Sequence, residues 1–233
     1  KKRNESDVPY VSIIGYTNCG KSTILNSMIR LSESGAKEVL AKDMLFATLQ
    51  TFVRQIKFSS GYEFIASDTV GFVSNLPTKL VEAFKGTLEE LKYADLILHV
   101  VDISDENMHL QIETTLDLMK SLGLMDKKVL RVYNKVDKLD EHRRLSLKDA
   151  EDTIYISAKN DDDVKKLIDK IETIIKEDYK EVTMRLAFKD SAIIDRLKKS
   201  YAVEVTKYDE ASMYIKVKLS QKDYNKYKEY VCE

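Results

Sequence analysis

Residues 15–22 read Gly15-Tyr16-Thr17-Asn18-Cys19-Gly20-Lys21-Ser22 and match the pattern G-x-x-x-x-G-K-[ST] in full. An apolar run at 10–14 precedes this segment, and a helical pattern at 22–31 follows it. A strand, a glycine-containing loop and a helix start form a phosphate cradle, because backbone N–H groups and the helix N-terminus both attract anions. We expect Lys21 to bridge the β- and γ-phosphates of a nucleoside triphosphate and the Ser22 hydroxyl to ligate Mg²⁺.

A second motif predicts which base the chain binds. Residues 134–137 read Asn134-Lys135-Val136-Asp137, an N-K-x-D box after a buried strand at 129–133. The Asp137 carboxylate can accept hydrogen bonds from the N1–H and exocyclic amine of guanine, whereas adenine offers no donors there. We expect Asn134 to tie this loop to the phosphate loop and the Lys135 stem to lie along the base. GTP and GDP, rather than ATP, are therefore the predicted ligands.

A third segment is expected to complete the base site. Ser157-Ala158-Lys159 follows a strand at 153–156. We expect the Ala158 N–H to meet the guanine carbonyl. The tripeptide carries little information alone, and it is assigned because it follows the other motifs in order.

Between the phosphate loop and the N-K-x-D box lie residues expected to sense the γ-phosphate. Asp68-Thr69-Val70-Gly71 follows a strand at 62–67; we expect Asp68 to hold the Mg²⁺ shell and the Gly71 N–H to reach the γ-phosphate. Upstream, Phe46-Ala47-Thr48-Leu49-Gln50 occupies the position of a first switch loop. Thr48 is the expected second protein ligand of Mg²⁺, and Thr51 is a competing candidate that spacing does not exclude. The predicted metal ligands are Ser22, Thr48 and Asp68, and the predicted catalytic residues are Lys21, Thr48 and Gly71.

Two positions bear on how fast the triphosphate is hydrolysed. Many signalling GTPases place a Gln after the D-x-x-G glycine to orient the attacking water, but this chain has Phe72. We therefore predict slow hydrolysis by the isolated chain and acceleration by a partner. Asn18 has two readings that the sequence leaves open. It can help to bind K⁺ beside the phosphates, or it can stabilise the loop through local backbone bonds.

The pattern of apolar runs predicts an α/β fold. We expect strands near 10–14, 51–58, 62–67, 95–101, 129–133 and 153–156, alternating with helical stretches except for one hairpin at 59–61. This is a P-loop small-GTPase-like fold, with a mostly parallel six-stranded sheet and one antiparallel strand. A helix starting near Pro77 carries an apolar stripe expected to pack in the core, and a helix at 162–176 closes the domain.

The remaining chain predicts a small β-α-β-β-α module. The expected strands are at 182–186, 202–207 and 212–219, with a helix across 193–197 and a final helix that carries Tyr224, Tyr227 and Tyr230. The spacing of these tyrosines favours buried packing over stacking on RNA bases. The predicted organisation is a charged N-terminal extension at 1–8, a GTP-binding domain at 9–178 and a C-terminal α+β domain at 179–233.

Composition favours a protein of the cytoplasm. Charged residues make up 33% of the 233 residues, but the net charge is −1, so a broad electrostatic grip on RNA is not predicted. Cys19 and Cys232 lack metal-ligand spacing, and reduced thiols are expected. No apolar run approaches the ~20 residues that span a membrane. We expect a monomer that does not insert into membranes.

Several of these runs resemble the GTPase domain of the HflX family. The resemblance is carried by the phosphate loop, by Asp68-Thr69-Val70-Gly71-Phe72, by His99-Val100-Val101-Asp102, by the N-K-x-D box, and by the runs at 42–49, 76–77 and 80–85. It covers the chain from about Val8 onward, more loosely after Lys176. This chain departs from the family at Cys19, where Ala is usual, and at 50–52, where Asp-Pro-Thr is usual. The family's N-terminal domain and helical linker have no counterpart here, and we expect the chain to be a fragment.

The resemblance implies a translation-factor-like GTPase that binds the large ribosomal subunit. Some members of the family split stalled or idle ribosomes. The first hypothesis is therefore a ribosome-associated enzyme whose slow hydrolysis times its release. The second is a nucleotide-gated module, acting in RNA modification or as a regulatory switch, in which hydrolysis is incidental.

Overall fold

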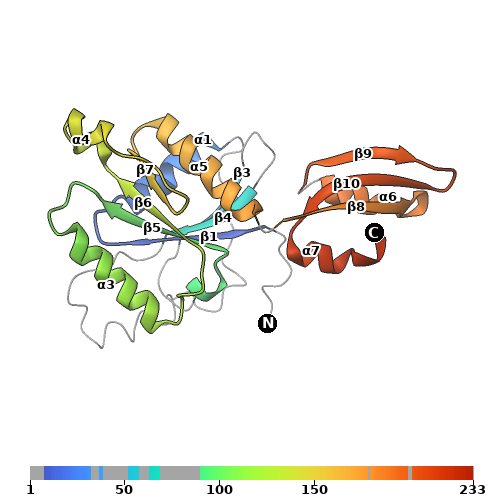
Figure 1. Cartoon of the computed structure of the whole chain (residues 1–233), viewed down its shortest axis with the longest axis horizontal. Helices are drawn as coiled ribbons and strands as arrows, with labels where there is room; N and C mark the ends of the chain where they lie inside the picture. Colours follow the sequence, from blue (N-terminus) through green and yellow to red (C-terminus); the bar gives the residue numbers. More distant parts are fainter. Residues whose placement is uncertain are drawn as a thin grey trace.

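The computed structural model describes residues 8–32, 37–38, 52–57, 63–68, 90–177, 179–198 and 201–232. These residues form a larger α/β lobe and a smaller C-terminal lobe that lie side by side (Figure 1). The predicted first switch loop at 46–50, the predicted D-x-x-G residues at 69–71 and the helix predicted from Pro77 lie outside the described residues.

The larger lobe is built on a seven-stranded sheet in the order β2-β3-β4-β1-β5-β6-β7. Only β3 runs against its neighbours, and the other pairings across β4, β1, β5, β6 and β7 are parallel. This confirms the predicted mostly parallel sheet with one antiparallel strand. The seventh strand, β2, has two residues, which is too short to show any periodicity in the sequence. The strands span Tyr10–Gly15 (β1), Lys37–Glu38 (β2), Phe52–Lys57 (β3), Glu63–Asp68 (β4), Leu96–Asp102 (β5), Val129–Asn134 (β6) and Thr153–Tyr155 (β7).

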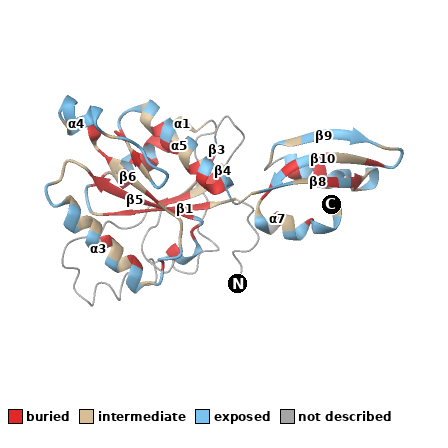
Figure 2. Cartoon of the chain, in the orientation of Figure 1, coloured by how far each residue is buried: buried red, intermediate tan, exposed pale blue. Residues whose placement is uncertain are grey.

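Helices cover both faces of this sheet. Helices α1 (Lys21–Leu31) and α5 (Asp161–Lys176) share one apolar cluster with alternate residues of the central strands. Helix α3 (Met108–Ser121) belongs to a second cluster with Ile14 and Ile97, whose side chains alternate to the other face. All seven residues of β5 are buried, as its continuous apolar run predicts (Figure 2). Short elements complete the lobe: α4 (Glu141–Leu145), η3 (Glu90–Tyr93) and η4 (Val136–Lys138).

Helix α5 begins where the third predicted motif ends. The Asn160 side chain caps it by accepting hydrogen bonds from the N–H groups of Asp162 and Asp163, at 2.9 and 3.3 Å. Acidic residues fill its first turn, which stabilises the positive end of the helix. The cap fixes the loop at 157–159 against the start of a 16-residue helix.

The smaller lobe confirms the predicted β-α-β-β-α order. Its antiparallel sheet has the order β8-β10-β9, and both helices pack on one apolar core. Tyr227 is buried in that core, and Tyr224 and Tyr230 pack against it, so the tyrosines of the last helical segment serve packing, as predicted. The elements span Lys180–Ala187 (β8), Phe188–Asp190 (η5), Ser191–Lys198 (α6), Val203–Tyr208 (β9), Ser212–Leu219 (β10), Gln221–Lys226 (α7) and Lys228–Tyr230 (η6).

One tyrosine joins the two lobes. The Tyr179 ring packs against the core that α5 shares with the large sheet, and its edge meets the Tyr201 ring at 5.9 Å. Burial, with Asp95 and Asp223 nearby, raises the pKa of Tyr179 to about 12. The Tyr201 hydroxyl donates to the buried carboxylate of Asp223. The joint is therefore aromatic in its centre and polar on the side of the smaller lobe.

None of the helices in the described ranges combines the length and the apolar character that a membrane crossing requires.

Candidate nucleotide-binding site

The phosphate loop depends on two glycines that no other residue can replace without displacement. Gly15 has φ +148, and a Cβ added to it would lie 2.2 Å from the Val100 carbonyl oxygen. Gly20 has φ +101, and a Cβ there would lie 2.2 Å from the Asn134 side-chain nitrogen. Both positions therefore need the absence of a side chain as well as the left-handed backbone.

Lys21 starts α1 directly behind this loop. Its side chain curls back over the loop, where Nζ donates to the Tyr16 carbonyl at 2.8 Å. The residue is only 7% exposed, so its charge lies within the cradle rather than in bulk solvent. The neighbouring Cys19 side chain is buried in the core, and burial raises the pKa of its thiol. The Cys19 side chain therefore belongs to the core and not to the phosphate-binding surface.

Two of the predicted magnesium ligands meet at the end of β4. Ser22 Oγ donates to Asp68 Oδ2 at 2.5 Å, and register pairing places Asp68 beside Ile13 of β1. The second carboxylate oxygen, Asp68 Oδ1, is buried and has no hydrogen-bond partner among the described residues. Burial raises the pKa of Asp68, while the Ser22 hydroxyl and the Lys21 charge lower it. A hydroxyl beside an unsatisfied carboxylate oxygen fits the oxygen-only ligand set that Mg²⁺ prefers.

On the base side, Asn134 connects three segments of the chain. Its Nδ2 donates to the Cys19 carbonyl at 2.8 Å, which ties the base loop to the phosphate loop as predicted. Its Oδ1 accepts from the Ala158 N–H at 2.9 Å. We expected that amide to meet the guanine carbonyl; here it is occupied by Asn134, a competition that the sequence spacing does not reveal.

Asp137 is oriented by the third motif. Ser157 Oγ donates to Asp137 Oδ1 at 2.7 Å, and none of the described residues bonds the other carboxylate oxygen, which can therefore face a ligand. Asp163 of α5 accepts from the Ser157 N–H at 2.7 Å and holds the loop that carries the hydroxyl. The predicted residues of the base loops are thus brought together, and the orientation of Asp137 is enforced by α5.

Lys135 is held by a carboxylate that sequence reasoning missed. Lys135 adopts φ +68, which is rare for a residue with a side chain. Its Nζ donates to the Asn18 carbonyl at 2.5 Å and to Asp102 Oδ2 at 2.6 Å. The backbone N–H and hydroxyl of Ser104 both donate to Asp102 Oδ1, at 3.0 and 2.6 Å.

The missed carboxylate has a charge stabilised by its neighbours. Burial alone would raise the pKa of Asp102, but the hydrogen bonds from Lys135 and Ser104 outweigh it and hold the pKa below its usual value. A signal was present in the sequence, because Asp102 ends a strand adjacent to the strand that Asn134 ends. Such ends meet at one edge of a parallel sheet.

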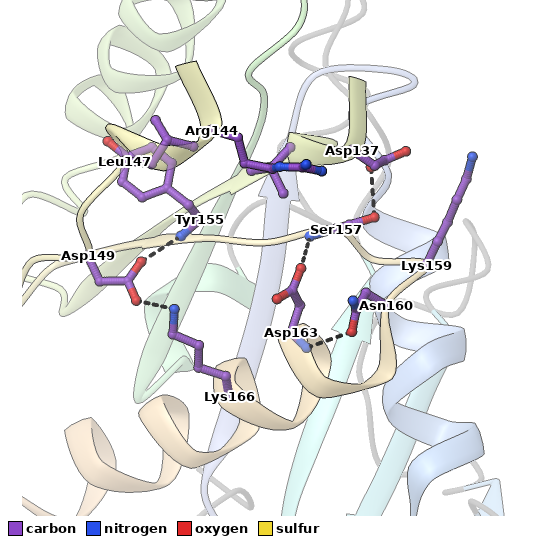
Figure 3. A pocket seen from close by; sticks show the side chains of 11 residues that line it. Asp137, Arg144, Leu147, Asp149, Tyr155, Ser157, Lys159, Asn160, Asp163 and Lys166 are labelled. Atoms are coloured by element: carbon purple, nitrogen blue, oxygen red, sulfur yellow. Dashed lines mark hydrogen bonds and ion pairs between the residues drawn. The ribbon is translucent and has the colours of Figure 1, made fainter. Parts of the chain in front are cut away.

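A cavity of about 630 Å³ opens beside these residues (Figure 3). The residues that line it include Asp137, Ser157 and Lys159 of the base loops, together with Arg144 and Tyr155. In Figure 3 the Arg144 side chain extends toward Asp137, and the Lys159 side chain extends away from the other labelled side chains. The size is that of a small-molecule site, and the cavity adjoins the carboxylate expected to bind guanine.

Several predicted site residues fall outside the described part of the chain. They are Phe46, Ala47, Thr48, Leu49, Gln50, Thr69, Val70 and Gly71, together with the alternative ligand Thr51 and with Phe72. Gly15, Tyr16, Thr17, Asn18, Cys19, Gly20, Lys21, Ser22, Asp68, Asn134, Lys135, Val136, Asp137, Ser157, Ala158 and Lys159 are described. They gather at the carboxyl ends of β1, β4, β6 and β7, where open α/β sheets bind ligands.

The fold and this site define a P-loop GTPase. A family model described as "50S ribosome-binding GTPase" matches residues 10–135. A GTP-binding protein of Sulfolobus solfataricus, solved in complex with GDP, has a similar structure, with a TM-score of 0.56 and 26% identity. The similarity covers 72% of this chain and 53% of that one.

Curated relatives narrow the family. A GTPase HflX of Lacrimispora saccharolytica is 37% identical over 215 residues, which is 92% of this chain and 49% of the relative. The GTPase HflX of Escherichia coli is 33% identical over 207 residues, which is 88% of this chain and 47% of the relative. The chain belongs to the HflX family of GTPases. It spans about half the length of these relatives.

Proposed function

We propose that this chain binds and slowly hydrolyses GTP with Mg²⁺ and acts on the large ribosomal subunit. The observation that carries the nucleotide part is Asn134, whose amide connects the phosphate loop to the base loops through Cys19 and Ala158. This contact supports a single site for a phosphate chain and a purine, because it holds the loops proposed to bind them next to each other. The ribosomal part is supported by the family description that matches residues 10–135 and by the HflX relatives.

Guanine selectivity follows from the Asp137 carboxylate. Ser157 occupies Oδ1, so the carboxylate presents its free oxygen in a fixed direction. Guanine supplies two N–H donors to a carboxylate, whereas adenine would leave the charge unpaired at a cost of about 1–3 kcal/mol or more. Lys135, held by Asp102 and Asn18, supplies an aliphatic stem beside the base.

The chain's own residues position the triphosphate for attack by water. The Lys21 ammonium and the N–H groups of the phosphate loop stabilise negative charge that shifts toward the leaving phosphate oxygens. Ser22 and Asp68 would hold Mg²⁺, which neutralises phosphate charge when it is bound. Thr48 and Gly71 are proposed to complete the γ-phosphate contacts. With Phe72 in the water-orienting position, hydrolysis stays slow until a partner rearranges the site.

The K⁺ reading of Asn18 has a specific structural basis. Asn18 adopts φ +61, which fits a loop-stabilising role, but its exposed side chain makes no hydrogen bond to the described residues. The amide oxygen is therefore available to a monovalent cation next to the phosphates. Single-turnover hydrolysis by the unchanged chain should be faster in KCl than in NaCl, and the rates should be equal in both salts for Asn18→Ala. This result would support a K⁺ site at Asn18. Equal rates in the unchanged chain would leave only the loop-stabilising role.

Co-sedimentation with large ribosomal subunits tests the proposed function. We expect binding with a non-hydrolysable GTP analogue and weaker binding with GDP. Because the chain spans about half of its relatives, the full-length protein is the one to test. A matched control is Asp137→Asn, which should lose binding with the GTP analogue and regain it with the xanthosine analogue, since an amide can donate to the xanthine 2-oxygen.

The outcomes separate the two hypotheses. Sedimentation that follows the nucleotide, and switches base in the variant, supports a ribosome-associated GTPase. If the full-length protein binds GTP but never sediments with the subunit, the alternative of a nucleotide-gated regulatory or RNA-modification module takes its place. Comparable affinity for ATP and GTP in calorimetry would defeat both.

A further inference from the structure

The sheet of the smaller lobe has one covered face and one exposed face. Met184, Leu186, Ile215 and Val217 point to the core that α6 and α7 share. Strand alternation places the residues between them on the opposite face. Side chains there are open to solvent; those of Arg185 and Lys216 are 54% and 46% exposed. We call this surface the open face and define it by Glu181, Thr183 and Arg185 of β8, Tyr214, Lys216 and Lys218 of β10, and Glu204 and Lys207 of β9.

An aromatic ring lies between two cations on the open face. Tyr214 is paired in register with Arg185 on one side and Lys207 on the other. The Arg185 guanidinium carbon lies 5.8 Å, and the Lys207 Nζ lies 5.7 Å, from the Tyr214 ring centre. These three residues form a row across all three strands. Because both cations lie over the ring, a base that stacks on Tyr214 must displace one of them, and the displaced cation is then placed to contact a phosphate.

The ring is fixed in place by the hairpin that joins β9 to β10. The Tyr214 hydroxyl donates to Asp209 Oδ2 at 3.2 Å, and Arg185 Nη2 donates to the same oxygen at 3.2 Å. The N–H groups of Ala211 and Ser212 donate to Asp209 Oδ1 at 2.9 and 2.6 Å. These bonds hold the pKa of Asp209 below its usual value. The orientation of Tyr214 is therefore set before any ligand arrives.

Positive charge exceeds negative charge on the open face. Four cations, Arg185, Lys207, Lys216 and Lys218, face two strand carboxylates, Glu181 and Glu204, and the hairpin carboxylate Asp209 pairs with Arg185. Glu181 bonds Lys216 at 2.8 Å, and no described carboxylate lies within ion-pair distance of Lys207 or Lys218. These two lysines stand on different strands, on either side of the Lys216 row, so they can contact successive anionic groups along one strand of ligand.

We propose that the open face binds single-stranded RNA, with bases stacked at Tyr214 and phosphates held by Lys207 and Lys218. Three strands spaced about 4.8 Å apart give a platform that one nucleic-acid strand can cross. Protein-protein interfaces place several apolar anchors at their centre, whereas Tyr214 is the single large apolar group among the described residues of this face. A polar, cationic sheet with one aromatic ring matches the way sheets bind unpaired bases.

This inference deepens the proposed function, because exposed loops of ribosomal RNA present unpaired bases. The experiment that tests it uses RNA alone, so its result does not depend on binding to the ribosome. The net charge of −1 argues against nonspecific electrostatic binding of RNA over the whole surface, and the open face localises the proposed contact to one surface of one lobe. Binding is expected to be weak and only modestly dependent on salt, since few phosphates are contacted.

Fluorescence anisotropy with a labelled oligoadenylate RNA of about twelve nucleotides tests the proposal on the whole chain. We expect Tyr214→Ala to weaken binding roughly ten-fold or more, and Tyr214→Phe to retain most of it, because the ring carries the stacking. Replacing Lys207 and Lys218 together by Ala should reduce the slope of log affinity against log salt by about 1.4, since each phosphate contact on a single strand contributes ~0.7.

Two controls match these variants. Tyr208→Ala removes a tyrosine that is 63% exposed on the same hairpin but pairs in register with Met213, whose side chain faces the covered side. Lys226→Ala removes a cation from α7, on the helical side of the lobe. Neither should change RNA affinity. Thermal unfolding and binding of a fluorescent GTP analogue, measured on every variant, confirm that the lobes remain folded.

Three results would overturn the inference. The first is that the unchanged chain shows no salt-dependent binding of RNA, and the second is that Tyr208→Ala and Tyr214→Ala lose RNA affinity equally. The third is that the chain binds a labelled oligoglutamate peptide in place of RNA, which would assign the face to an acidic protein segment. If RNA binding fails while nucleotide-dependent sedimentation with the ribosomal subunit holds, this inference is wrong and the proposed function stands. If sedimentation fails and RNA binding holds, the reverse is true.

Discussion

Replacing Asp102 with Asn is expected to accelerate the release of GDP roughly ten-fold, although Asp102 does not line the cavity beside the base loops. The reason is Lys135, which must hold a left-handed backbone while its side chain reaches the phosphate loop. The Asp102 carboxylate and the Asn18 carbonyl share the Lys135 ammonium. Removing the charge of Asp102 leaves the ammonium with one neutral acceptor and releases the stem that lies beside the base.

The magnitude follows from the geometry of the pair. The Lys135 and Asp102 side chains are 23% and 12% exposed, so solvent screens their 2.6 Å contact only partly. A hydrogen bond between charged groups contributes a net ~1.5–3 kcal/mol. Because the bond to Asn18 persists, we assign about half of the upper value, ~1.4 kcal/mol, to the nucleotide-bound state, and this corresponds to a factor of ten. Asn at position 102 keeps the shape and the Oδ1 acceptor for Ser104, so the fold is expected to persist.

Stopped-flow release of a fluorescent GDP analogue measures the effect. Asp105→Asn is the matched control, because Asp105 also accepts a backbone N–H, from Asn107 at 2.8 Å, but does not contact the phosphate loop. In a double-mutant cycle, Asp102→Asn should have little further effect once Lys135 is Met. A release rate within two-fold of the unchanged chain, or a full effect that survives in the Lys135→Met background, would refute the reasoning.

The same prediction has a defined pH dependence. The pKa of Asp102 in the folded chain lies below its usual value, which for Asp in an unfolded chain is about 3.9. The carboxylate's contribution is therefore complete above that value and is lost only as the pH falls through the lower folded pKa. The difference between Asp102→Asn and the unchanged chain should consequently be flat from pH 6 to 8.

Three other predictions concern the glycines, the base and a buried histidine. Gly20→Ala places a Cβ 2.2 Å from Asn134 Nδ2 at φ +101, and should lower the free energy of unfolding by about 2–4 kcal/mol and also weaken nucleotide binding. Gly123→Ala, at φ +68 with nothing within 4 Å, should lower the free energy of unfolding by only ~1–2 kcal/mol. Equal losses in thermal unfolding would contradict the steric argument. Asp137→Asn should weaken GTP by about 2 kcal/mol or more and strengthen XTP in calorimetry; unchanged base preference would remove Asp137 from the base site. His99 is 1% exposed, and burial, with a smaller contribution from the Arg131 charge, lowers its pKa to about 4. Its contribution to stability is therefore complete above pH ~6.5, and about 3 kcal/mol of the free energy of unfolding is lost on acidification toward pH 4. A His99→Gln variant should lack that part of the acid sensitivity, and an acid-unfolding profile identical to that of the unchanged chain would exclude His99 as its source.

The phosphate loop could be predicted from the sequence because its chemistry resides in adjacent residues. Gly15, Gly20, Lys21 and Ser22 are fixed by spacing along one strand, loop and helix, and the structure places them accordingly. The parallel part of the sheet was equally predictable, since its central strands are apolar runs bounded by turns, whereas the two-residue strand β2 was not. The contact of Ser157 with Asp137 could be anticipated only in outline, because it joins two loops.

Other features depend on contacts between distant segments, which no local pattern encodes. Asp102 acquires its role only when β5 and β6 lie side by side, and the Ala158 N–H meets Asn134 Oδ1 because β6 and β7 are also neighbours. The joint between Tyr179 and Tyr201 likewise joins residues from different lobes. In the smaller lobe, the tyrosines of the last helix gave a helical period that correctly predicted burial. Tyr214 lies on a strand, where alternation alone does not say which face is covered.

The site has two sides that differ in their hydrogen bonds. On one side the loops bond to each other, and on the other a buried oxygen lacks a hydrogen-bond partner among the described residues. On the base side, Asn134 and Lys135 bind the backbone carbonyls of Cys19 and Asn18, so the two loops move as one unit, and a change at either is felt at the other. On the metal side, Asp68 shares one short hydrogen bond with Ser22 and keeps a buried oxygen without a described partner. An unpaired buried oxygen is costly, so a cation or donor that reaches it gains more there than elsewhere in the loop. On the proposed function, the base would therefore be selected where the loops are already bonded to each other, and the phosphate state would be sensed at the carboxylate that still has an oxygen without a described partner.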